Sequence, residues 1–126
     1  MPVFYKILPG LMVMVEFVNL TPHEVVVFNE EGKEVLRIPP SGEVLRVETE
    51  TVKVGEIEGV PVYALKYVKV GLPEEKEGRY YIVSSVVLNF LRGSKITRKD
   101  FLAPNTDKAI RDENGRIIGV VGFVRL

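Results

Sequence analysis

Valine occupies 22 of the 126 positions of this chain, whereas alanine occupies only three. Side chains that branch at Cβ lose rotamer freedom in a helix and pack well on a pleated sheet. The valines recur in short runs, and the segments between the runs contain glycine, proline or asparagine, a pattern typical of strands joined by turns. We therefore expect a β-rich fold.

Composition removes several classes of site. Charge is balanced, with 17 Lys and Arg against 17 Asp and Glu, so no basic field favours phosphate. The chain has no cysteine and one histidine, which excludes disulfides, thiol chemistry and metal centres that need Cys or two His. We expect neither a metal nor a cofactor. The length fits a single domain over residues 1–126, and the charged fraction and tight turns are compatible with a thermophile.

The pattern predicts seven to eight strands and one short helix. The expected strands are 13–18, 24–28, 34–38, 43–54, 60–70, 79–83, 108–111 and 116–124. The helix is expected over 85–92, with Ser84 as N-cap and Gly93 as the residue that follows its end. Residues 101–106 look irregular. Because the hairpins follow one another, we expect an antiparallel barrel-like or sandwich-like sheet, with the helix over one end or face.

The first residues are atypical. Their apolar run is broken by Pro9 and Gly10, and it lacks the length and cleavage site of a secretory signal. No stretch approaches the ~20 apolar residues of a membrane span, so we expect a soluble, cytoplasmic protein without a membrane partner. Met12 and Met14 are alternative starts. Residues 1–13 are then either an extension packed on the sheet or an artefact of start assignment.

The segment 60–70 is apolar on both faces. Alternation places Val60, Val62, Ala64, Val68 and Val70 on one face, where Lys66 is the exception, and Tyr63, Leu65 and Tyr67 on the other. Such a strand is either central in a sheet or part of an interface. This favours a homo-oligomer.

Six short motifs in a fixed order resemble a known family. They are Asn19–His23, Pro39–Gly42, Gly59–Val62, Tyr81–Ser84, Ala103–Thr106 and Arg111–Gly115. Together, over about residues 15–124, they are similar to a family of small proteins from actinobacterial, phage and archaeal genomes. Members of that family begin just before the first motif. The resemblance implies no activity, but it directs attention to loops, where sites concentrate.

A candidate ligand site gathers polar residues from these motifs. A small anionic ligand would be held by Asn19, Thr21, His23, Asn105, Thr106 and Arg111. His23 has the only side chain with an ordinary pKa near neutrality, which makes it the acid–base candidate. The structural alternative is that Asn19 and Thr21 brace a kink and that Arg111 belongs to a hairpin turn.

An enzymatic hypothesis would use His23 as general base with Ser84 or Asp112, in a hydrolase or lyase. Ser84 lacks the flanking glycines of a nucleophile elbow, so the N-cap interpretation is favoured, and no residue is assigned as catalytic. A third hypothesis concerns a basic loop that could contact phosphate or an acidic partner: Arg92, Lys95, Arg98 and Lys99. Without interleaved aromatic residues this loop is a poor nucleic-acid groove.

Three functions therefore stay open. The first is a non-enzymatic small-ligand-binding or assembly module that forms an oligomer. The others are a nucleic-acid or regulatory partner-binding protein that uses loop 92–99, and a small enzyme that uses His23. In addition, Gly119 and Gly122 interrupt the last strand and predict a bulge or a sheet corner there.

Overall fold

The structure is a computed structural model, and it describes residues 4–8, 13–69 and 71–125. Its strands are β1 (Phe4–Leu8), β2 (Val13–Asn19), β3 (Val25–Phe28), β4 (Glu34–Ile38), β5 (Glu48–Ile57), β6 (Val60–Lys69), β7 (Arg79–Ile82), β8 (Phe101–Pro104), β9 (Ala109–Arg111), β10 (Ile117–Val121) and β11 (Phe123–Arg125). The helix α1 spans Ser85–Gly93, and a 3₁₀ turn, η1, spans Thr106–Lys108. The expectation of a β-rich chain with one helix near 85–92 is confirmed.

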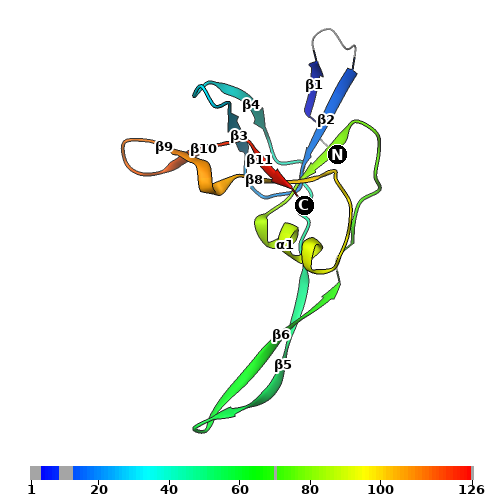
Figure 1. Ribbon diagram of the computed structural model, residues 1–126, viewed down its shortest axis with the longest axis vertical. Coiled ribbons are helices and arrows are strands. Elements are labelled where there is room, and N and C mark those ends of the chain that lie inside the picture. The colour runs from blue at the N-terminus through cyan, green and yellow to red at the C-terminus, as the bar shows by residue number, and fades with distance from the viewer. Residues whose placement is uncertain (1–3, 9–12, 70, 126) are drawn as a thin grey trace.

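The strands form three separate sheets (Figure 1). The five-stranded sheet has the order β1-β2-β7-β8-β11, and the four-stranded sheet has the order β4-β3-β10-β9. Among the described strands, β5 pairs only with β6. The expected barrel or sandwich of seven to eight antiparallel strands is therefore wrong. Three of the pairs are parallel, namely β2 with β7, β7 with β8 and β3 with β10. Turn signals identify hairpins, but they carry no information on which distant strand inserts beside them.

The chain passes directly between the two larger sheets at three places. One is the segment 105–108, which leads from β8 of the five-stranded sheet to β9 of the four-stranded sheet. The segment 20–24 leads from β2 of the five-stranded sheet to β3 of the four-stranded sheet, and Gly122 separates β10 from β11. Gly122 has φ +76°, a backbone conformation that other residues rarely adopt. The pairing of β10 with β9 also shifts register between Ile117 and Gly119. The predicted bulge and sheet corner are both present.

The core lies in two clusters that meet at β7. Tyr81 packs with α1 residues such as Leu88 and Leu91, while the adjacent Ile82 packs with the four-stranded sheet. Successive residues of a strand point to opposite faces, so β7 has apolar surroundings on both sides. This explains why the segment 81–83 is a continuous apolar run.

The start of the helix is as predicted, whereas its end is not. Ser84 caps the helix by accepting a hydrogen bond from the Val87 N–H at 3.3 Å. The helix continues through Gly93, and Lys95 takes the left-handed conformation at φ +58°. Ile96 N–H donates to Leu91 O at 3.1 Å and its side chain packs on the core. The packing of the partly buried Ile96 thus outweighs the preference of glycine for the left-handed position.

Two further predictions need correction. Residues 101–104 are strand β8 rather than irregular chain, because Pro104 lies at the strand end, where a missing donor is tolerated. The expected strand 43–54 is displaced to Glu48–Ile57. Leu45 and Val47, which were expected in this strand, pack on the core instead. The Leu45 N–H donates to Leu20 O at 3.0 Å. Within residues 1–13, Phe4–Leu8 pair with β2, and residues 1–3 and 9–12 lie outside the described chain.

Strands β5 and β6 form a long hairpin that projects away from the rest of the molecule (Figure 1). We call residues 48–69 the arm. Every residue of β5 is exposed. The part of the chain that the structure describes has no helix that is long and apolar enough to cross a membrane.

Candidate functional site

The segment Asn19–His23 is held by one buried amide side chain. Asn19 Nδ2 donates to His23 O at 2.8 Å and to Ile38 O at 3.1 Å, and Asn19 Oδ1 accepts from Thr21 N–H at 3.0 Å. Thr21 Oγ1 lies 2.7 Å from Asn19 Oδ1 and 3.0 Å from His23 O. Asn19 is 1% exposed, so these bonds satisfy groups that water cannot reach.

Three of the six short motifs meet at this segment. Ser41 N–H donates to Asn19 O at 3.0 Å, and Leu20 N–H donates to Ile82 O at 2.8 Å. Residues 19–23, 39–42 and 81–84 therefore meet at the passage from β2 to β3. In contrast, Gly59–Val62 lies at the tip of the arm and Arg111–Gly115 at the tip of the β9–β10 hairpin.

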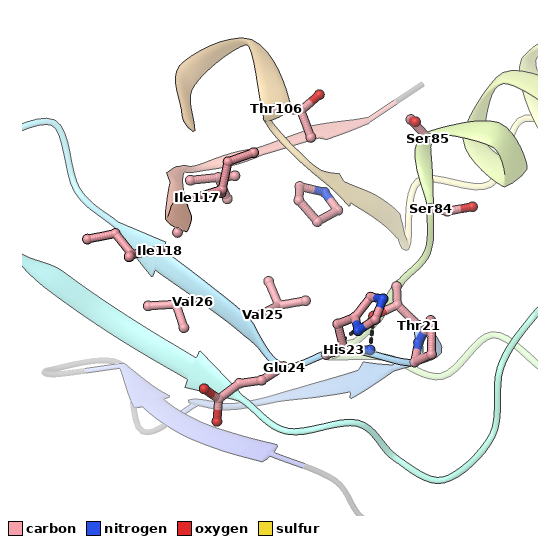
Figure 2. A pocket seen from close by; sticks show the side chains of 14 residues that line it. Thr21, His23, Glu24, Val25, Val26, Ser84, Ser85, Thr106, Ile117 and Ile118 are labelled. Atoms are coloured by element: carbon pink, nitrogen blue, oxygen red, sulfur yellow. Dashed lines mark hydrogen bonds between the residues drawn. The ribbon is translucent and has the colours of Figure 1, made fainter. Parts of the chain in front are cut away.

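A cavity of about 500 Å³ opens beside this junction (Figure 2). Its hydroxyl and imidazole groups, from Thr21, His23, Ser84 and Ser85, gather on one side, and Val26, Ile117 and Ile118 lie opposite them, with Thr106 at the rim. Glu24 also lines the cavity, and its carboxylate pairs with Arg37 at 2.7 Å. Neither ring nitrogen of His23 hydrogen-bonds to another described residue. The cavity has the size and the mainly apolar lining of a small-molecule site.

The structure brings three of the six expected ligand residues together. Thr21, His23 and Thr106 line the cavity. Asn19 is not among the cavity residues, and it holds the backbone of Thr21 and His23 through hydrogen bonds. Asn105 Nδ2 donates to Val121 O at 3.2 Å. Arg111 Nη1 donates to Gly115 O at 2.8 Å within its own hairpin. Ser85 and the apolar wall were not expected, because only the packing of β3 against β10 creates that wall.

The groups of the enzymatic hypothesis are partly assembled. Ser84 lines the same cavity as His23, but its hydroxyl accepts the helix-capping hydrogen bond from Val87. Asp112 is not among the cavity residues, and its Oδ1 accepts from Asn114 and Arg116 N–H in a turn. Among the described residues, no group of three or more His, Asp or Glu side chains is placed to hold a metal ion.

Arg98 of the basic loop is part of a partly buried contact. Its Nε and Nη2 donate to Asp100 at 2.8 and 2.6 Å, and its guanidinium lies 4.9 Å from the centre of the Phe101 ring. The hydrogen bond to Asp100 raises the pKa of Arg98 above its ordinary value. Arg92, Lys95 and Lys99 are exposed. The loop thus presents three of its four cations to solvent.

The arm is a second candidate for a functional surface, because it carries half of the exposed large apolar side chains of the described residues. Its exposed large side chains are Val52, Val54, Ile57, Val60, Tyr63 and Leu65. At its base Leu65 and Thr49 line a groove of about 460 Å³ together with Val86 of α1 and Val44. We call this the root groove.

The total surface is large for the mass of the chain. The chain exposes 8789 Å², whereas a compact monomer of 14.2 kDa exposes about 6,800 Å², so the excess is about 2,000 Å². The arm contributes to this excess, since β5 is exposed on both faces. For comparison, a standard interface removes about 800 Å² from each partner.

Comparison of the chain with protein-family models, curated proteins and solved structures found no match. The cavity and the arm are therefore the two features of the molecule that indicate a function.

Proposed function

We propose that the protein is a non-enzymatic assembly module that associates with a second copy of itself through the arm. The observation that carries this proposal is the arm, a hairpin of ten residues per strand with large apolar side chains exposed on both faces. An isolated two-stranded hairpin is at best marginally stable in water. A second copy in contact with the arm would supply neighbours that the hairpin lacks.

The charges of the arm support a protein partner over nucleic acid. Residues 48–69 contain four glutamates and three lysines. Lys53 pairs with Glu56 at 2.8 Å, and Lys66 lies 4.0 Å from Glu50. A surface that binds phosphates has an excess of cations. A balanced, self-neutralising surface suits contact with an identical surface.

The experiment compares two matched valine-to-glutamate variants by sedimentation velocity. Val52 of the arm is 46% exposed, and Val35 of β4 is 42% exposed. We expect Val52→Glu to shift a dimer toward monomer, since it adds a charge to the part of β5 that contacts the second copy, and Val35→Glu to leave the dimer intact. Equal behaviour of both variants and the wild type would contradict the proposal.

A second candidate function is the binding of a small anion with an apolar body in the cavity beside His23. It is favoured by the separation of the hydroxyl and imidazole groups from the isoleucine side chains in that cavity, where the Glu24 carboxylate is paired with Arg37. Hydroxyl and imidazole groups could bind the anionic end, and the isoleucine and valine side chains would surround the apolar end.

This candidate is tested by calorimetric titration with hexanoate, 1-hexanol and hexylamine. We expect hexanoate to bind most tightly and His23→Ala to weaken it roughly 3- to 10-fold, the value of one hydrogen bond. Arg111→Ala is the control, because Arg111 lies outside the cavity lining. Equal affinity for all three probes, or loss of binding in both variants, would exclude an anion site at His23.

A further inference from the structure

The two free edges of the arm differ in their ability to accept another strand. Glu58 and Gly59 form the turn at φ +50° and +79°, and Ile57 pairs with Val60. In such a two-residue turn, the closing pair exchanges its hydrogen bonds inside the hairpin. The next pair, Glu56 and Pro61, therefore points its backbone groups outward. Pro61 has no N–H, so the β6 edge lacks a donor near the tip, and the β5 edge retains its donors.

The regular part of the β5 edge is short. Register shifts occur between Glu48 and Thr49 and between Lys53 and Gly55. Residues 49–53 pair one to one with β6 between these irregularities. The extra residue is Val68 of β6 at the first shift and Val54 of β5 at the second, so the β5 edge itself is interrupted at Val54. A bulge disturbs the edge on which it lies, so the run 49–53 before it is the part best able to pair with another strand.

Charge selects one register for pairing this run with its own copy. Outward groups recur at every second residue, so a two-fold antiparallel pairing places one residue opposite itself. We call that residue the centre of the pairing. If the centre is Glu50 or Lys53, a charged residue lies directly opposite its own copy. A centre at Thr49 opposes Glu48 to Glu50, and a centre at Val52 opposes Glu48 to Glu56. Like charges directly opposite each other are destabilising.

The remaining centre, Thr51, opposes no like charges. It places Thr49 opposite Lys53 and Glu50 opposite Val52 of the second copy. If this pairing continues past Glu48 at the base of the arm, Arg46 comes close to Glu56 of the second copy. Arg46 is exposed beside the root groove and forms no ion pair among the described residues. The two-fold pairing thus supplies the partner that Arg46 lacks among the described residues of its own chain.

We infer that the homodimer is an arm-to-arm complex in which β5 pairs antiparallel with β5 of the second copy, centred on Thr51, and each tip reaches the root of the other arm. This inference rests on the proposed assembly function and specifies its geometry. The result is a four-stranded sheet with the order β6-β5-β5-β6, whose outer edges carry Pro61.

Single cysteines test the register, since the chain has none of its own. Thr51→Cys would lie opposite its copy, with Cα atoms about 4.5–5.5 Å apart, within disulfide range. Thr49→Cys is the matched control on the same strand. In this register it is four residues out of line with its copy, about 14 Å away, which is too far for a disulfide. Both variants are oxidised with copper–phenanthroline and their masses are read on non-reducing gels, beside the sedimentation mass of the wild type.

We expect a covalent dimer with Thr51→Cys and little or none with Thr49→Cys. If the wild type is a dimer and Thr49→Cys links as well as Thr51→Cys, the register is wrong, while the assembly function stands. If the wild type is a dimer and neither variant links, pairing through the β5 edge is wrong. If the wild type is a monomer, both the inferred geometry and the proposed function fail.

Discussion

Asn19 shows how much structure a single side chain can fix. Its amide spans the passage between two sheets by binding backbone groups of residues 21, 23 and 38. A turn role for Asn19 and Thr21 could be predicted from sequence, because both side chains readily bond to nearby backbone. The contact with Ile38 could not, since it depends on β4 lying beside the passage.

Replacing Asn19 with alanine is expected to destabilise the fold by about 2–4 kcal/mol, because several buried backbone groups lose their partner at once. Asn29→Ala is the control. Asn29 also binds two backbone N–H groups through Oδ1, but in an exposed turn, where water can replace it. Chemical denaturation measures both. A similar small loss of unfolding free energy in the two variants would mean that the hydrogen bonds of Asn19 are not needed for stability.

Two glycines provide an opposed pair of predictions. A Cβ on Gly119 would lie 2.4 Å from Phe28 Cε2 and 2.8 Å from Val26 O, whereas a Cβ on Gly93 would meet nothing within 4 Å. We expect Gly119→Ala to destabilise by about 1–3 kcal/mol through overpacking. Gly93→Ala is expected to stabilise by about 0.5–1 kcal/mol, because it lies in helix α1. Melting temperatures that move in the same direction would contradict this account.

The arm has the apolar side chains expected of a buried element, but it is exposed: every residue of β5 is accessible to solvent. From sequence, segment 60–70 could be a central strand or an interface, and the structure excludes the central position, because β6 pairs only with β5 among the described strands. Local patterning gave no way to choose between these alternatives, since burial on both faces looks the same whether the neighbour is in the same chain or in another. The interface stays a prediction.

Hydrogen exchange tests the arm as an element. If β5 pairs with a second copy, its amides should exchange more slowly in a concentrated sample than in one diluted below the dissociation constant. Amides of β3, inside the four-stranded sheet, should show no such dependence. Exchange from β5 that is fast and independent of concentration would indicate an arm with no partner strand.

At the scale of the whole molecule, sequence predicts the inventory of elements better than their arrangement. Alternation and turns located most strands, and capping located the start of α1. The parallel insertion of β7 beside β2, and of β10 beside β3, depends on contacts between segments that lie more than 50 residues apart. The cavity depends on the same insertions, so three of the six candidate residues converge there while the others have local structural roles.

The central claim is that this chain assembles through its arm, and its mass in solution tests that claim most directly. Sedimentation equilibrium of the wild-type protein at micromolar concentration should give twice 14.2 kDa, and Val52→Glu should reduce the mass toward 14.2 kDa under the same conditions. A wild-type mass of 14.2 kDa across the accessible concentration range would contradict the account.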